Sequence, residues 1–186
     1  HWGVFVHDGK VEVDYENPTK QKVIVKNSLI DQSGKTVATT KDFSFHIPQS
    51  SLHMWSCEDP YIYKVRTQLI AGGKVVDEVK SYAAMRTIGT GKDPDNGFLR
   101  MQLNRKNYFH YGPLDQGWYP DGLYTAATEE AMRYDLLVTK QLGFNMIRKH
   151  VKVEPDRWYY LCDSLGLLVW QDMPSGDWTS PWQMTQ

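Results

Sequence analysis

The sequence predicts a multidomain β plus α/β protein, in which an antiparallel β-sandwich precedes the first βαβαβ part of an incomplete (β/α)8 TIM barrel. Two observations support this fold class. In the first half of the chain, apolar and polar residues alternate with a period of two, which is typical of strands with one buried face. In the second half, short apolar runs alternate with helical patterns, which is typical of parallel strands joined by helices. We expect domains at residues 1–88 and 98–186, joined by a linker at 89–97.

The alternation in the first half is clearest in three runs. These are Val11–Tyr15, Phe43–Ile47 and Tyr61–Val65, and turn signals such as Gly72-Gly73 separate them from further runs. About seven short strands, with a turn every 8 to 12 residues, are typical of an antiparallel sandwich of immunoglobulin-like size. The sequence shows no catalytic constellation there, so we expect a structural role. The stretch 89–97 is rich in glycine and aspartate, which favours a linker.

Two Leu-Gly pairs in the second half precede apolar runs that end in polar residues. Leu142-Gly143 precedes the run ending in Arg148–His150, and Leu165-Gly166 precedes the run ending in Gln171-Asp172. A near-continuous apolar run is typical of a parallel strand covered by helices, and a glycine just past a helix adopts the left-handed C-terminal cap. The polar residues therefore fall at the carboxyl ends of parallel strands, where α/β folds bind ligands.

The helices of this region have clear start signals. Thr128 can cap a helix whose first turn holds two glutamates, and this helix should end at Gly143. A second helix begins near Pro155, which suits the first helical position, and ends at Leu165. We predict that Asn107–Tyr111 forms the strand before both helices.

The number of repeats is too small for a closed barrel. Such a barrel needs about 250 residues, and this chain has room for only three βα-type repeats after its first strand. The sheet would stop at an open apolar edge, which natural proteins cover. We therefore expect an internal fragment of a longer protein; self-association through the open barrel edge is the alternative.

Composition excludes some partner classes. The formal net charge is −1, so there is no basic footprint for nucleic acid. No apolar run approaches the roughly 20 residues of a membrane helix, and the start of the chain does not resemble a signal peptide. We expect neither nucleic acid nor membrane as a partner.

Cysteine and histidine spacing predicts no metal site and no cofactor. The six histidines have no zinc-type spacing, and neither cysteine has a Cys-x-x-Cys partner. We expect Cys162 to be a buried thiol on the apolar side of the second helix, and Cys57 to be an incidental surface thiol. The compartment is not determined by two cysteines; periplasmic and extracellular locations of the parent protein are both compatible with them.

Tryptophans are concentrated in the second half of the chain. We predict that Trp158 and Trp170 belong to the core. Trp118 and Trp178 fall in polar loops just beyond strands. Indole faces stack on the C–H faces of sugars, but tryptophan is also a large packing residue, so both interpretations of these two side chains stay open.

Four stretches resemble a known family in the same order. These are Trp55–Tyr63, Ala84–Ile88, Leu103–Lys106 and the block from Asp135 that ends in Tyr159–Gly166. They resemble glycoside hydrolase family 2, which contains β-galactosidases, β-glucuronidases and β-mannosidases. Cys57 replaces the usual proline of the family's Trp-Ser-Pro-Glu stretch.

The resemblance implies an enzyme of carbohydrate metabolism. Such an enzyme has a sandwich followed by a catalytic barrel, and it hydrolyses O-glycosidic bonds of β-glycosides with retention, using two glutamates. In the family, one glutamate follows the fourth barrel strand and the other follows the seventh. This sequence reaches neither strand. We expect the isolated chain to be inactive; the alternative is a non-catalytic sugar-binding or interaction module.

The resemblance also implies candidate substrate-binding residues. Arg148 matches the family's arginine near the nucleophile, where a guanidinium could hold a carboxylate ionised, although a structural ion pair uses the same geometry. His150 stands one position before the family's histidine, so a sugar-ligand role and a structural role are both open.

Three further candidates depart from the family pattern. Leu114–Trp118 replaces a histidine-rich box, and within it Asp115 could accept hydrogen bonds from sugar hydroxyls or cap a loop. Trp118 is the aromatic candidate of this stretch. Asp172 follows the third strand, where some relatives bind magnesium; we predict a pocket-floor residue there and no metal.

Overall fold

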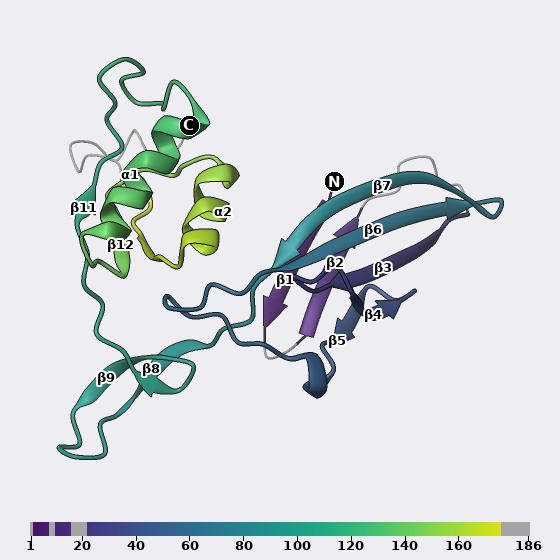
Figure 1. Cartoon of the computed structure of the whole chain (residues 1–186), viewed down its shortest axis with the longest axis horizontal. Helices are drawn as coiled ribbons and strands as arrows, with labels where there is room; N and C mark the ends of the chain where they lie inside the picture. The colour runs from purple at the N-terminus through teal and green to yellow at the C-terminus, as the bar shows by residue number, and fades with distance from the viewer. Residues whose placement is uncertain (1, 8–9, 16–21, 176–186) are drawn as a thin grey trace, which may run out of the picture. The chain divides into compact units, whose positions relative to one another are not determined.

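The computed structural model describes residues 2–7, 10–15 and 22–175 (Figure 1). β-Strands are the main regular structure of these residues, with two α-helices and one short 3-10 helix among them. The chain divides into two compact units, residues 1–109 and 110–186. None of the helices in the described part of the chain is long and apolar enough to cross a membrane.

The first unit contains two antiparallel sheets that share one hydrophobic core. The four-stranded sheet has the order β4-β3-β6-β7, and a three-stranded sheet has the order β1-β2-β5. Buried residues from both sheets meet in this core, among them Val11, Phe45, Leu29 and Val65. The strands are β1 (Trp2–His7), β2 (Lys10–Tyr15), β3 (Ile24–Ile30), β4 (Thr36–Thr40), β5 (Ser44–His46), β6 (Tyr63–Ala71) and β7 (Lys74–Ala83), with the 3-10 helix η1 at Gln49–Ser51.

The predicted alternation is visible in β6. Tyr63, Val65 and Thr67 are buried, whereas Lys64 between them is exposed. The period-two pattern thus correctly located strands in this half of the chain, because each strand has one face on the core.

A third antiparallel sheet contradicts part of the predicted linker. Strand β8 (Ile88–Lys92) pairs with β9 (Leu99–Leu103), which also pairs with β10 (Lys106–Asn107). The first residues of 89–97 are therefore a strand. The glycine- and aspartate-rich part that follows is a hairpin turn, in which the backbone N–H of Gly97 donates to the carbonyl of Asp93 at 2.8 Å.

The predicted first parallel strand, Asn107–Tyr111, was also wrong. Asn107 pairs antiparallel with β9, and the first parallel strand is β11 (Leu114–Asp115). The start of this stretch is used by the hairpin with β9: Asn107 pairs with Gln102, and the backbone N–H of Tyr108 donates to the carbonyl of Met101 at 2.9 Å.

The second unit has the predicted βαβαβ order. Its parallel sheet has the order β11-β12-β13, and two helices connect the strands. The elements are β11, α1 (Glu129–Gln141), β12 (Met146–Lys149), α2 (Asp156–Leu165) and β13 (Leu168–Gln171).

The helix ends follow the local signals in the sequence. The Thr128 hydroxyl accepts a hydrogen bond from the N–H of Ala131 at 3.1 Å. Gly143 and Gly166 have φ of 87° and 76°, the left-handed conformation that ends a helix. Pro155 is the N-cap residue of α2 and not its first helical residue, a shift of one position.

The helices α1 and α2 cover one face of the parallel sheet. The core between them contains buried side chains from both layers: Met132, Leu136, Ile147, Trp158, Leu161, Cys162 and Leu167. The predicted burial of Trp158 and Cys162 is therefore confirmed. Trp170 was predicted as core but is 41% exposed, because it points to the face that the helices do not cover.

Cys57 corrects a second burial prediction. It was expected at the surface, yet its exposed fraction is only 2%. The turn that holds Cys57 follows Trp55, which is fully buried and whose N–H donates to the carbonyl of Met85 at 2.7 Å. This contact draws the turn against the core. Neither cysteine forms a disulfide bond.

Candidate functional site

Polar side chains at the carboxyl ends of the parallel strands form the candidate site. The register places Leu114 opposite Arg148 and Arg148 opposite Trp170, and the next row contains Asp115, Lys149 and Gln171. Successive side chains of a strand point to opposite faces. Because Ile147 of β12 packs against the helices, Lys149 shares its face and Arg148 points to the other. The two rows therefore face different surroundings.

The uncovered face carries an arginine–carboxylate pair. The Nε of Arg148 lies 3.1 Å from Oδ2 of Asp172, and Nη2 lies 2.9 Å from the same oxygen. A third contact joins Nε to Oδ1 at 3.3 Å. The structure thus brings two predicted site residues together as an ion pair that is still partly open to solvent.

A histidine that the sequence reasoning missed lies on the same face. The indole N–H of Trp170 donates to Nδ1 of His110 at 2.8 Å. Burial lowers the pKa of His110 below its usual value, so the ring favours its neutral form. The only signal in the sequence was the position of His110 a few residues before a parallel strand.

The covered face carries a buried charge cluster, which consists of Asp115, Lys149, Lys152 and Glu154. The Lys149 ammonium lies 2.6 Å from Oδ2 of Asp115 and 2.8 Å from Oε1 of Glu154. The Lys152 ammonium lies 2.9 Å from the same glutamate oxygen. Two cations and two carboxylates balance, as the cost of burying charge requires.

Three members of this cluster were not predicted. Lys149, Lys152 and Glu154 are 0%, 5% and 7% exposed. The burial of Lys149 could have been predicted from the sequence. Lys149 follows Ile147 by two residues in β12, so the two side chains share the buried face of the strand. The pairing with Glu154 depends on how the chain turns after the strand, which the pattern does not reveal.

Asp115 is held by protein groups. Its Oδ1 accepts a hydrogen bond from the N–H of Gly117 at 2.7 Å, so it caps its loop as one interpretation predicted. Its Oδ2 belongs to the buried charge cluster. Asp115 therefore lies on the opposite side of the sheet from Arg148 and Asp172, although all three are at the same carboxyl edge.

His150 and Trp118 lie in the loops beyond the strands. The Nδ1 of His150 is 3.2 Å from the side-chain nitrogen of Gln116. Trp118 is 64% exposed and packs against Tyr124, with the ring centroids 5.2 Å apart. Trp178, the other aromatic candidate, lies outside the described residues.

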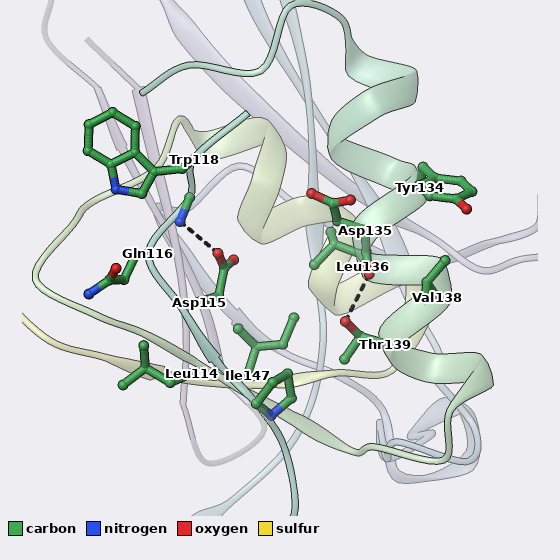
Figure 2. A pocket seen from close by; sticks show the side chains of 12 residues that line it. Leu114, Asp115, Gln116, Trp118, Tyr134, Asp135, Leu136, Val138, Thr139 and Ile147 are labelled. Carbon is green, nitrogen blue, oxygen red and sulfur yellow. Dashed lines mark hydrogen bonds between the residues drawn. The ribbon is translucent and has the colours of Figure 1, made fainter. Parts of the chain in front are cut away.

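A cavity of about 420 Å³ lies between the helix α1 and residues 113–118, which include β11. Figure 2 shows Asp115 and Asp135 facing this space from its two walls, with Trp118 at its edge. Burial, and secondarily the charge of Asp115, raises the pKa of Asp135. The cavity thus brings Asp115 and Trp118 to one space, separate from the pair of Arg148 and Asp172.

Within residues 2–7, 10–15 and 22–175, no group of three or more histidine, cysteine or acidic side chains is arranged to hold a metal ion. The expectation of no metal and no cofactor stays a prediction.

Comparison with known proteins relates this arrangement to a family. Residues 6–86 match the model described as Glycosyl hydrolases family 2. The chain is 31% identical over 143 residues to a β-galactosidase of Psychromonas ingrahamii, an alignment that covers 76% of this chain and 13% of that protein. It is 30% identical over 125 residues to a β-glucuronidase of Bacteroides fragilis, which covers 65% of this chain and 17% of that protein.

A solved structure matches almost the whole chain. The FMN-binding β-glucuronidase from Faecalibacterium prausnitzii L2-6 superposes with a TM-score of 0.73 at 25% identity, over 93% of this chain and 27% of that chain. The chain thus spans less than a third of the length of each of these proteins. By the family match and these similarities, the chain is related to the glycosyl hydrolases of family 2, as its motifs predicted.

Proposed function

We propose that the chain is part of a retaining β-glycosidase that hydrolyses O-glycosidic bonds of β-linked carbohydrates. In this proposal the first unit is an immunoglobulin-like β-sandwich, and the second is the opening βαβαβ part of a catalytic (β/α)8 TIM barrel. Two antiparallel sheets on one core support the first assignment. A parallel sheet with helices on one face and polar side chains at its carboxyl ends supports the second.

The domain boundaries belong to this proposal. The sequence favours 1–88 and 98–186. The division of the chain after Phe109 favours a later boundary, with the sheet β8-β9-β10 assigned to the first unit.

The observation that carries the proposal is the position of Arg148. Its guanidinium lies at the carboxyl end of the second parallel strand, on the uncovered face, and binds a carboxylate through two nitrogens. Retaining hydrolysis needs an ionised carboxylate nucleophile about 5 to 5.5 Å from a carboxylic acid. A bidentate arginine favours the ionised form and fixes its orientation. We infer that Arg148 positions the nucleophile of the complete enzyme and pairs with Asp172 in this chain.

The proposed substrate is a β-linked carbohydrate, and this proposal does not specify which sugar it contains. The relatives include proteins named β-galactosidase and proteins named β-glucuronidase. We propose Asp115, Trp118, Arg148, His150 and Asp172 as substrate-binding residues, directly or through the groups they hold. Carboxylates and an imidazole suit sugar hydroxyls, and the exposed indole of Trp118 suits a C–H face.

The test uses nitrophenyl β-glycosides. The 186-residue chain should show no turnover, and a longer protein that contains it and the two glutamates should hydrolyse one of these substrates. Replacing Arg148 by Met in the longer protein should lower kcat by about 10- to 100-fold, because hydrogen bonds to charged groups are worth about 1.5 to 3 kcal/mol. The exposed Arg133→Met is the control.

Two results would contradict the proposal. One is turnover by the isolated chain that Asp115→Asn or Asp172→Asn abolishes. The other is tight monosaccharide binding by the isolated chain in calorimetry together with an inactive longer protein, which would favour a non-catalytic sugar-binding module.

A further inference from the structure

One ammonium group joins both ends of the loop that carries Trp118. The Nζ of Lys152 lies 2.9 Å from the carbonyl oxygen of Gly117 and 2.7 Å from that of Tyr124. Lys152 is 5% exposed, and its third partner is the carboxylate of Glu154 at 2.9 Å. An ammonium has three donors, so these three oxygens satisfy it. We call residues 117–124 the Trp118 loop.

The Trp118 loop has few other internal bonds that fix its shape. The N–H of Tyr119 donates to the carbonyl of Leu123 at 2.7 Å, and the N–H of Leu123 donates back at 3.0 Å. The N–H groups and carbonyls at the ends of such a loop need partners from elsewhere. Lys152 supplies a donor for two of these carbonyls.

The ammonium also reaches Trp118 through one aromatic ring. The Nζ of Lys152 lies 4.3 Å from the ring centroid of Tyr124, a cation–π distance. The same ring packs against Trp118 at 5.2 Å. The orientation of Trp118, which is otherwise largely exposed, therefore depends on a ring that Lys152 holds.

Gly117 is the residue that lets Lys152 approach. A Cβ there would lie 2.5 Å from the lysine Nζ and 2.7 Å from Oε1 of Glu154. Gly117 also has φ of 67°, which disfavours any other residue. The loop and the ion pair fit together only with glycine at this position.

Lys152 is in turn fixed to the parallel sheet. Its partner Glu154 also binds Lys149 at the end of β12. The carbonyl of Lys152 accepts a hydrogen bond from the side chain of Gln171 at 2.7 Å. Val151 just before it has φ of 45°, a conformation that a β-branched residue adopts only when its surroundings enforce it.

We propose that Lys152 is a positioning residue that fixes Trp118 relative to the strand ends and so sets the sugar-stacking surface of the site. The function of Trp118 rests on the proposed glycosidase function. The contacts of Lys152 with the Trp118 loop, which we call the Lys152 clamp, do not rest on that function. The clamp and the glycosidase function can therefore be tested separately. The ligand class is a pyranose ring, whose C–H face meets the exposed indole.

The first test measures the loop without a substrate. The 186-residue chain is labelled with 5-fluorotryptophan, and the ¹⁹F signal of Trp118 is assigned with Trp118→Phe. Lys152→Met should shift and broaden this signal and leave that of Trp158 in place. Hydrogen exchange should speed up at least about tenfold in residues 117–124 and stay unchanged in β12, because only the loop loses its bonds.

Lys140→Met is the matched control. Lys140 lies in the last turn of α1 and also donates to a backbone carbonyl, that of Gly166 at 2.8 Å. It should leave the Trp118 signal unchanged. A folded Lys152→Met chain with an unchanged Trp118 signal and unchanged loop exchange would overturn the proposal.

A second variant serves if Lys152→Met does not fold. Tyr124→Leu keeps all four charges of the cluster and removes only the ring between Lys152 and Trp118. It should shift the Trp118 signal with little loss of stability. An unchanged signal in this variant would also overturn the proposal.

The last test separates positioning from stability. In the longer, active protein, Lys152→Met should raise KM by about two- to tenfold and change kcat less, as expected when a stacking contact is misplaced. A purely structural residue would lower the active fraction and leave KM as it is. If the longer protein is inactive, the glycosidase proposal fails. The ¹⁹F measurement still shows whether Lys152 fixes the position of Trp118.

Discussion

Lys149 shows how much one buried charge depends on residues far away in the sequence. Its side chain is fully buried, with the ammonium 4.6 Å from the ring centroid of Trp158. Its two carboxylate partners come from different segments: Asp115 is the last residue of β11, and Glu154 lies just before α2. Lys149 therefore joins the end of β12 to the end of β11 and to the segment before α2.

Removing this cation should destabilise the protein strongly. Lys149→Met leaves Asp115 and Glu154 with one fewer cation in a largely buried place, which typically costs about 3 to 5 kcal/mol. The measurement is the free energy of unfolding in urea, with Lys140→Met as the control. Equal stability of the two variants would show that the cluster contributes little.

Asp135 should make the stability depend on pH. Its pKa is raised above the usual value of 3.8, first by burial and then by Asp115. A raised pKa means that the folded state holds the proton more tightly than the unfolded state, so this contribution to stability is complete below pH 3.8 and is lost as the pH rises through the folded pKa.

The variant Asp135→Asn tests this sign. It should be more stable than the wild type at neutral pH, and the difference should disappear below pH 3.8. The readout is the thermal midpoint at both pH values. Asp121→Asn, at an exposed aspartate, should not show the trend. A wild type that gains stability relative to Asp135→Asn as the pH rises would contradict the assignment.

At the scale of the elements, the parallel sheet leaves an apolar surface uncovered. Within the described residues, β13 pairs only with β12, and Trp170 and Leu114 on the face away from the helices are 41% and 52% exposed. Unpaired strand edges and apolar faces promote association between chains. Self-association of the isolated chain thus stays a prediction.

Sedimentation velocity over a range of concentrations tests it. The mean sedimentation coefficient should rise with concentration for the wild type and rise less for Trp170→Glu, which places a charge on the uncovered face. Val76→Glu, at a 59% exposed residue of the first unit, is the control. A strictly monomeric wild type would count against pairing through this edge.

The elements also show why some predictions succeeded. The two helices and the strands β12 and β13 were predictable, because Thr128, Gly143 and Gly166 act locally through caps. The strand predicted at Asn107–Tyr111 failed. Its aromatic composition favours a strand, but its first residues bond antiparallel to β9 and so are not available to the parallel sheet.

At the scale of the whole molecule, the chain combines two kinds of β-structure. Antiparallel sheets share a core in the first unit, and a parallel sheet with helices forms the second. The similarity to β-galactosidases and β-glucuronidases extends across both kinds of sheet, because the alignments cover 76% and 65% of the chain. The candidate site draws all its residues from the second unit.

The sequence by itself determined the βαβαβ order of the second unit, the helix ends and the family resemblance, because periodicity, caps and motifs are properties of neighbouring residues. It also placed Arg148 and Asp172 at strand ends. Only the tertiary structure decided that these two residues pair with each other, that Asp115 faces the opposite side with Lys149, and that Lys152 closes the Trp118 loop. Those outcomes depend on which strands are neighbours in the sheet and on the path of each loop. A charged side chain can pair only with a group that folding brings within a few ångströms, and these partners are far apart in this sequence.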